Sequence, residues 1–298
     1  MSGPLPKRCG FCALIGAPNA GKSTLLNTLA GTKISIVSHK VQTTRARIRA
    51  IVIEEASQII FVDTPGIFKP RRKLDEAMVE GAWAGAAEAD AVILLADARQ
   101  APDDIADLVA ALPQIKSDVR LALNKIDLVK RDKLLDISAA YNAAYPFKAT
   151  YMISALTGSG VADLRRDVAS LMPEGPWLYP EDQIADMPLR FLASEITREK
   201  VYERLHEELP YASTVETEKW EERKDGSVRI DQVVYVEREG QRKIVLGKNG
   251  QTIKALGTAA RTELEEVLAR RVHLFLFVKV RENWTKDPER LRMMGLVD

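Results

Sequence analysis

The most constraining feature of this chain is a glycine-rich segment that joins an apolar run to a helical pattern. Residues 11–15 read as a short buried strand, and the chain continues as Gly16-Ala17-Pro18-Asn19-Ala20-Gly21-Lys22-Ser23-Thr24. Gly16 and Gly21 permit backbone conformations and a close approach that a β-carbon would block. The loop amides and the N-terminus of the following helix can then surround phosphate oxygens. The segment therefore predicts a phosphate-binding loop, with nucleotide contacts from Gly16 and from residues 19–24.

Three side chains of this loop have more specific expected roles. Lys22 is expected to reach the β- and γ-phosphates and to act in catalysis, and the Ser23 hydroxyl is expected to bind Mg²⁺. Asn19 has two interpretations of similar weight. In one, its amide oxygen holds a monovalent cation such as K⁺ beside the phosphates, where the cation supplies charge during catalysis. In the other, the side chain only caps the loop.

Two further segments complete a predicted metal and switch site. The apolar run 59–62 ends at Asp63-Thr64-Pro65-Gly66. This predicts that Asp63 faces the metal and that the Gly66 amide contacts a γ-phosphate until that phosphate leaves. Thr44 lies in a polar segment after the first predicted helix, and it is expected to supply the second hydroxyl to Mg²⁺. Thr43 is the alternative.

Ile67 departs from the pattern of well-known switches. Ras-type switches carry a glutamine after the glycine that corresponds to Gly66, and this glutamine orients the attacking water. Isoleucine offers no hydrogen bond to water. The chain is therefore expected either to hydrolyse its nucleotide slowly by itself or to position the water by other means.

The base preference depends on two loops that follow later buried runs. The first loop is Asn124-Lys125-Ile126-Asp127. The Asp127 carboxylate can accept from both N–H groups on one edge of guanine, and adenine lacks them. Asn124 is expected to join this loop to the phosphate loop, and the Lys125 stem is expected to lie over the base. In the second loop, Ser154-Ala155-Leu156, a backbone amide is expected to donate to the guanine O6, with Ala155 favoured. The five motifs together favour a guanine-nucleotide switch over the alternative of a P-loop ATPase or kinase.

Composition is that of an ordinary globular protein. The 298 residues suggest two domains, and the net charge of +1 identifies no partner. Cys9 and Cys12 have no second cysteine pair, so we expect a structural role and a reducing compartment. No run approaches the roughly 20 apolar residues of a membrane-spanning helix. A cytoplasmic protein is expected.

The chain divides into two regions of different pattern. Strands and helices alternate over residues 1–172, which predicts an α/β nucleotide-binding domain with a mostly parallel sheet and helices on both faces. A proline-rich linker is expected over 173–188. Residues 189–298 then predict a smaller α+β domain. Its expected elements are a helix over 189–208, a hairpin of 214–222 and 228–237, an apolar entry over 242–246, helices over 251–256 and 259–271, and a strand over 272–280.

The turn Gly247-Lys248-Asn249-Gly250 lies between the helical segments of the second region. This order of elements is that of a type II KH domain, whose glycine turn clamps about four nucleotides of single-stranded nucleic acid. Five basic residues and no acidic residue occur over 242–262, as expected of a strip that faces phosphates. An ordinary solvated surface is the alternative. The expected RNA contacts are Arg242, Lys243, Gly247, Lys248, Asn249, Gly250 and Lys254.

With these motifs in order, the chain resembles the Era family of bacterial GTPases over about residues 10–284. The resemblance extends to Ile67 and to four further segments, which are Gln42-Thr43-Thr44-Arg45, Tyr179-Pro180-Glu181-Asp182, Arg198-Glu199-Lys200 and Glu208-Leu209-Pro210-Tyr211. It implies a monomeric GTPase that binds 16S rRNA near its 3′ end, assists assembly of the 30S ribosomal subunit and contacts the inner membrane peripherally. It also implies that GTP favours the RNA-competent state. The alternative is a signalling GTPase whose C-terminal domain docks a protein partner.

Overall fold

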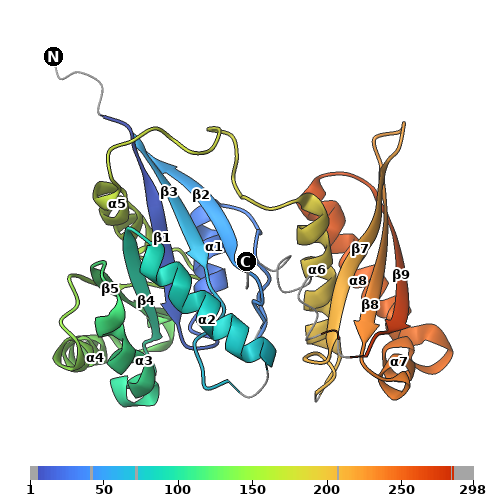
Figure 1. Ribbon diagram of the computed structural model, residues 1–298, viewed down its shortest axis with the longest axis horizontal. Helices are drawn as coiled ribbons and strands as arrows, with labels where there is room; N and C mark the ends of the chain where they lie inside the picture. Colours follow the sequence, from blue (N-terminus) through green and yellow to red (C-terminus); the bar gives the residue numbers. More distant parts are fainter. Residues whose placement is uncertain (1–5, 41–42, 71–72, 207, 283, 285–298) are drawn as a thin grey trace. The chain divides into compact units, whose positions relative to one another are not determined.

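The structure is a computed structural model that describes residues 6–40, 43–70, 73–206, 208–282 and 284, and these divide into two units (Figure 1). The first unit contains residues 6–35 and 44–186, and the second contains 36–43 and 187–284. No helix among the described residues is long and apolar enough to cross a membrane.

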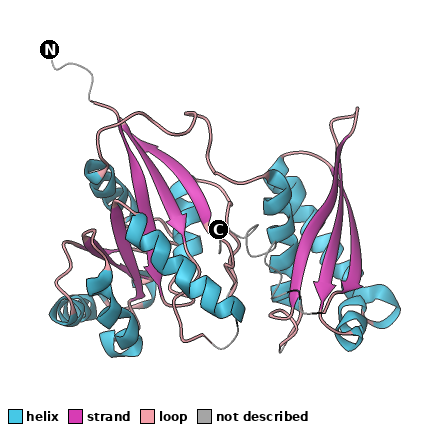
Figure 2. Cartoon of the chain, viewed as in Figure 1, coloured by secondary structure: helices cyan, strands magenta, loops and turns pink. Residues whose placement is uncertain are grey.

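The first unit is built around a six-stranded sheet in the order β2-β3-β1-β4-β5-β6. Only β2 and β3 pair antiparallel, and the other neighbours are parallel. The strands are β1 (Arg8–Gly16), β2 (Ile48–Glu54), β3 (Ser57–Asp63), β4 (Ala91–Asp97), β5 (Val119–Asn124) and β6 (Thr150–Met152). The helices are α1 (Lys22–Ala30), α2 (Lys73–Glu88), α3 (Ala106–Ala111), α4 (Arg131–Ala144) and α5 (Val161–Leu171). The α/β fold with a mostly parallel sheet is as predicted (Figure 2).

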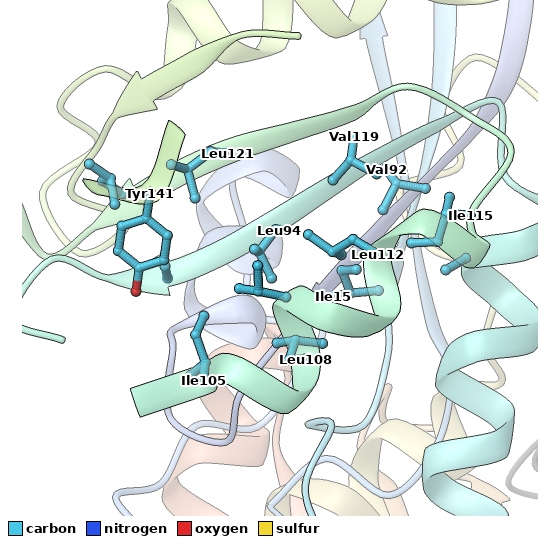
Figure 3. Close-up of a cluster of buried hydrophobic side chains, with 14 of the residues drawn as sticks. Ile15, Val92, Leu94, Ile105, Leu108, Leu112, Ile115, Val119, Leu121 and Tyr141 are labelled. Carbon is cyan, nitrogen blue, oxygen red and sulfur yellow. The ribbon is translucent and has the colours of Figure 1, made fainter. Parts of the chain in front are cut away.

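The central strands are apolar on both faces because helices cover both faces of the sheet. Every residue of β4 is buried. On one face, Ile15, Leu94 and Leu121 pack with Leu108 of α3 and Tyr141 of α4 in one core cluster (Figure 3). This packing fixes the strands so that the loops at their carboxyl ends gather at one edge of the sheet. Gly16, Asp63 and Asn124 each end a strand at that edge.

The second unit is a three-stranded sheet in the order β7-β8-β9 with helices α6, α7 and α8 (Figure 1). Its elements are α6 (Leu189–Arg204), β7 (Ser213–Glu222), β8 (Val228–Val236), α7 (Glu239–Leu246), α8 (Gln251–Leu268) and β9 (Val272–Val280). The antiparallel β7–β8 pair and the parallel β8–β9 pair reproduce the predicted KH order. In this unit the buried Arg198 of α6 pairs with Glu195 and donates to the carbonyl oxygen of Thr43.

The helix boundaries of the second unit differ from the prediction at three places. Residues 242–246, predicted only as an apolar entry to the turn, lie in helix α7, and α6 ends at Arg204 instead of residue 208. Residues 251–268 form one continuous helix, because the buried residues Leu256, Ala260 and Leu264 keep their helical spacing across Gly257. A β-carbon on Gly257 would make an ordinary van der Waals contact with Leu276 of β9 at 3.5 Å, so the packing there does not require glycine.

The proline-rich segment 173–186 belongs to the first unit and lies against its sheet. The Gln58 side chain accepts hydrogen bonds from the amides of Leu178 and Tyr179 at 2.9 and 3.0 Å and donates to the Tyr179 carbonyl at 2.8 Å. Further along, the Ile51 amide donates to the Ile184 carbonyl at 2.8 Å. The segment predicted as a linker is thus held as a strap up to Asp186.

Candidate nucleotide site and RNA-binding turn

The phosphate-binding loop runs from Gly16, the last residue of β1, to Lys22, the first residue of α1. A β-carbon on Gly16 would lie 2.4 Å from the Leu95 carbonyl oxygen, and one on Gly21 would lie 2.2 Å from Asn124 Nδ2. Both distances are shorter than any tolerable contact. The two glycines are therefore required by the close packing of this loop against β4 and β5.

The side chain of Lys22 is buried and folds back over the phosphate-binding loop. Its ammonium donates to the carbonyl oxygens of Gly16 and Ala17 at 2.9 and 3.0 Å. Burial lowers the pKa of Lys22 to about 8, and the nearby Asp63 opposes this shift. An anionic group at the loop would favour the charged lysine. The position and the electrostatics of Lys22 therefore fit a phosphate ligand.

The three predicted magnesium ligands converge beside Lys22. The Ser23 hydroxyl lies 2.7 Å from the Thr44 hydroxyl and donates to Asp63 Oδ2, also at 2.7 Å. The Thr44 hydroxyl lies 3.4 Å from the same oxygen. Asp63 is fully buried, and burial raises the pKa of its carboxyl. Its Oδ1 has no hydrogen-bond partner among the described residues. A buried carboxylate with an unsatisfied oxygen and two converging hydroxyls fits a hard cation such as Mg²⁺.

The alternative Thr43 does not face this cluster, since its hydroxyl donates to the Lys40 carbonyl at 2.7 Å. A residue that the sequence reasoning missed, Ser35, donates to Asp63 Oδ2 at 3.2 Å. No sequence signal pointed to Ser35, because it lies outside every motif.

Gly66 and Ile67 lie against the phosphate loop. A β-carbon on Gly66 would stand 2.9 Å from the Pro18 nitrogen. The Ile67 amide donates to the Gly16 carbonyl at 3.0 Å, and its side chain packs on the core cluster shown in Figure 3. Ile67 thus has a packing role, and its side chain offers no polar group to an attacking water.

The base loops are joined to the phosphate loop by the buried Asn124. Its Nδ2 donates to the Ala20 carbonyl at 2.8 Å, as predicted, and its Oδ1 accepts from the Ala155 amide at 2.9 Å. The Ala155 amide was the favoured donor to the guanine O6, but here it is bound to Asn124. This hydrogen bond ties the two base loops to each other. In the same two loops, the side chains of Asp127 and Leu156 are exposed.

Lys125 has a positive φ of 65° and reaches across to the phosphate loop. Its ammonium donates to the Asn19 carbonyl at 2.6 Å and to Asp97 Oδ2 at 2.9 Å. The sequence reasoning missed Asp97. The sequence did contain a signal for Asp97. It is an acidic residue at the end of the apolar run 91–97, as Asp63 is at the end of its own strand.

The glycine turn of the second unit connects α7 to α8. Gly247, Asn249 and Gly250 have φ values of 72°, 52° and 74°. A β-carbon on Gly247 would lie 2.1 Å from the Thr252 hydroxyl oxygen, whereas one on Gly250 would meet open space. The side chains of Lys243, Lys248, Asn249 and Lys254 are exposed on and beside this turn. Arg242 differs from them, because it pairs with Glu239 at 2.9 Å.

Two family descriptions match the chain, one in each unit. Residues 11–125 match the family described as 50S ribosome-binding GTPase, and residues 208–285 match the KH domain. The GTPase Era of Rhizobium meliloti is 62% identical over 296 residues, which cover 99% of this chain and 95% of that protein. The GTPase Era of Bradyrhizobium diazoefficiens is 60% identical over 294 residues, with coverage of 98% and 96%.

Two solved structures are similar along nearly the whole chain. One is an Aquifex aeolicus Era variant bound to GDP·AlF4⁻, and the other is Era in complex with MgGDPNP and nucleotides 1506–1542 of 16S ribosomal RNA. Each has a TM-score of 0.90 and 37% sequence identity, and each match covers 98% of this chain and 100% of that structure.

Proposed function

Because this chain belongs to the Era family and is a GTPase, we propose that it couples GTP hydrolysis to binding of 16S rRNA near its 3′ end. Through that binding it assists assembly of the 30S ribosomal subunit. The observation that supports the proposal most strongly is that one chain contains both a preformed cluster of metal-binding side chains and an exposed basic glycine turn. These are the Ser23–Thr44–Asp63 cluster beside Lys22 and the glycine turn 247–250 with its exposed lysines.

In this proposal the nucleotide site acts through side chains that are already positioned. Ser23 and Thr44 hold Mg²⁺ with the buried Asp63 behind them, and the ion supplies positive charge to the β- and γ-phosphates when it is bound. Lys22 adds charge from the other side of the loop, and the Gly66 amide contacts the γ-phosphate. Asp127 accepts from the guanine edge, and Asn124 holds the loop that carries it.

Charge at the transition state comes from a second ion in our proposal. Ile67 cannot orient water, so the site needs another source of rate enhancement. The Asn19 amide oxygen would hold K⁺ beside the phosphates, and the ion would supply positive charge there, as an arginine does in other switches. The RNA contacts are made by Lys243, Lys248, Asn249 and Lys254, together with the two turn glycines and Arg242. We further propose that the protein works as a monomer in the cytoplasm with peripheral contact to the inner membrane, as its family resemblance implies.

Direct titration tests the RNA function. An RNA that spans nucleotides 1506–1542 of 16S rRNA is titrated with the full chain in GDP and in GDPNP, at low and at physiological salt. We expect tighter binding in GDPNP. We also expect that Lys248→Asp combined with Asn249→Asp weakens binding several-fold to several-hundred-fold, most at low salt.

The control is Lys224→Asp, which reverses an exposed charge of the same unit in the turn between β7 and β8. It is expected to bind RNA like the unsubstituted chain. If the double variant also binds like the unsubstituted chain, the turn does not contact RNA, and the alternative of a GTPase that docks a protein partner gains weight.

A further inference from the structure

Asp97 is a buried carboxylate at the nucleotide edge of the sheet that none of the five motifs includes. It ends β4 and lies beside Asn124 in the parallel register of β4 and β5. Its side chain is 8% exposed, whereas those of its two ion-pair partners, Arg99 and Lys125, are 52% and 26% exposed. A carboxylate this buried is expected only where its partners repay its desolvation.

The partners of Asp97 surround both of its oxygens. Oδ1 accepts from the Arg99 amide at 3.0 Å and from Arg99 Nε at 2.9 Å. Oδ2 accepts from Arg99 Nη2 at 2.6 Å and from Lys125 Nζ at 2.9 Å. Burial by itself would raise the pKa of Asp97, but the hydrogen bonds from Arg99 and Lys125 hold it below its ordinary value. Asp97 is therefore a permanent anion at this edge.

Lys125 is held at two points as a result. Its ammonium contacts the Asn19 carbonyl of the phosphate loop and Asp97 of β4, and its backbone has a left-handed conformation. A free lysine chain samples many rotamers, and a ligand that needs one of them must first select it. With both contacts in place, the Lys125 ammonium is fixed between the phosphate loop and the end of β4.

From this geometry we infer that Asp97 is a positioning residue for guanine recognition, which acts by holding Lys125 against the base. Arg99 shares the carboxylate and keeps it in place from the solvent side. The inference rests on the proposed nucleotide site. Because the base is common to GDP and GTP, Asp97 contributes equally to the affinity for both and does not read the γ-phosphate.

Asp97→Asn tests this role, because asparagine keeps the size of the side chain and removes its charge. We expect affinities for GDP and for GTP to fall together, by roughly 10- to 100-fold, as for the loss of a charge-assisted hydrogen bond. The matched control is Asp186→Asn, which breaks the 3.0 Å ion pair with Arg49 in the same unit. It is expected to leave both affinities unchanged.

A double-mutant cycle with Lys125→Met separates positioning from general stability. Methionine keeps an unbranched apolar stem but cannot pair with Asp97. If Asp97 acts through Lys125, the double variant binds GDP no more weakly than Lys125→Met alone. Full additivity of the two losses, or unchanged GDP affinity in Asp97→Asn, would overturn the inference.

Asp97→Glu provides a second readout if the asparagine variant does not fold. Glutamate keeps the charge, so Asp97→Glu alone is expected to bind GDP more tightly than Lys125→Met alone. The combination of Asp97→Glu with Lys125→Met is expected to bind GDP no more tightly than Lys125→Met alone. A gain in the combination would contradict the role. If the unsubstituted chain failed to bind GDP, the proposed function itself would be wrong. That result is distinct from a chain that binds GDP but shows no coupling between Asp97 and Lys125.

Discussion

At the scale of single residues, the site depends on a few buried charges whose environments make them respond to a ligand. Asp63 is fully buried with one unsatisfied oxygen, and Lys22 is buried on two backbone carbonyls. Each group is costly in isolation. A phosphate with its metal ion satisfies both at once, which explains why nucleotide and ion are expected to bind cooperatively here.

The base preference is tested at Asp127. Asp127→Asn is expected to weaken GTP binding strongly and to create affinity for xanthosine triphosphate, because asparagine can donate to the O2 of xanthine where aspartate accepts from guanine. Direct calorimetric titration of each chain with GTP and with xanthosine triphosphate measures the change. Equal GTP affinity in variant and unsubstituted chain would show that another residue reads the base.

Lys22 predicts a pH dependence of binding. Since the pKa of Lys22 is lowered to about 8, the ammonium loses its proton above that pH and no longer attracts phosphate. GDP affinity is expected to be flat below pH 7 and to fall by up to about tenfold per pH unit above 8. Titrations between pH 6 and 9.5 measure this dependence, and Lys22→Gln should bind GDP weakly with no such slope.

The contribution of Lys22 to the free energy of unfolding changes with pH in the opposite direction. The folded chain binds fewer protons between about 8 and the ordinary 10.5, so stability rises with pH over that window.

Asn19 predicts a dependence on the monovalent salt. If its amide oxygen holds K⁺ beside the phosphates and the site prefers K⁺, GTP hydrolysis is expected to be faster in K⁺ than in Na⁺ at equal ionic strength. Asn19→Ala should reduce the difference. Phosphate release in the two salts measures it, and equal rates for the unsubstituted chain would leave only the capping role for Asn19.

At the scale of elements, the second unit predicts which turn glycine matters most. Gly247→Ala places a methyl group 2.1 Å from the Thr252 hydroxyl oxygen at a φ of 72°, so it suffers both a clash and backbone strain. Gly250→Ala and the control Gly226→Ala have φ values of 74° and 80° but open space, and each should cost only the strain of about 1–2 kcal/mol. Chemical denaturation should therefore rank Gly247→Ala as clearly the least stable. Equal losses at the three positions would contradict this.

The sequence predicted the elements best where one strand or helix carries its own pattern. An apolar run that ends in a polar residue is a local signal, so the sequence alone predicts that Asp63 and Asn124 lie at one edge of the sheet. The break predicted near residue 257 was wrong, since the helical spacing of the buried Leu256, Ala260 and Leu264 continues through Gly257. The strap over 173–186 was not foreseen, because its bonds to Gln58 join residues more than a hundred positions apart. Asp97 gives the same local signal at the end of its apolar run, but it was missed because it belongs to none of the five motifs.

At the scale of the whole molecule, the two activities are assigned to different units, and this predicts that each can be lost alone. The combined variant Lys248→Asp and Asn249→Asp keeps both turn glycines, so the turn should persist. We expect it to lose RNA binding while its GDP affinity and its GTP hydrolysis without RNA change little, because that chemistry uses residues 16–156. Conversely, Asp127→Asn should lose GTP while its RNA affinity without nucleotide stays unchanged. Titration of each variant with nucleotide and with RNA gives the four affinities that this prediction compares. Loss of GTP binding in the turn variant would show that the RNA turn contributes to the nucleotide site. Such a result would mean that the turn residues themselves, and not only the RNA bound to them, affect nucleotide binding.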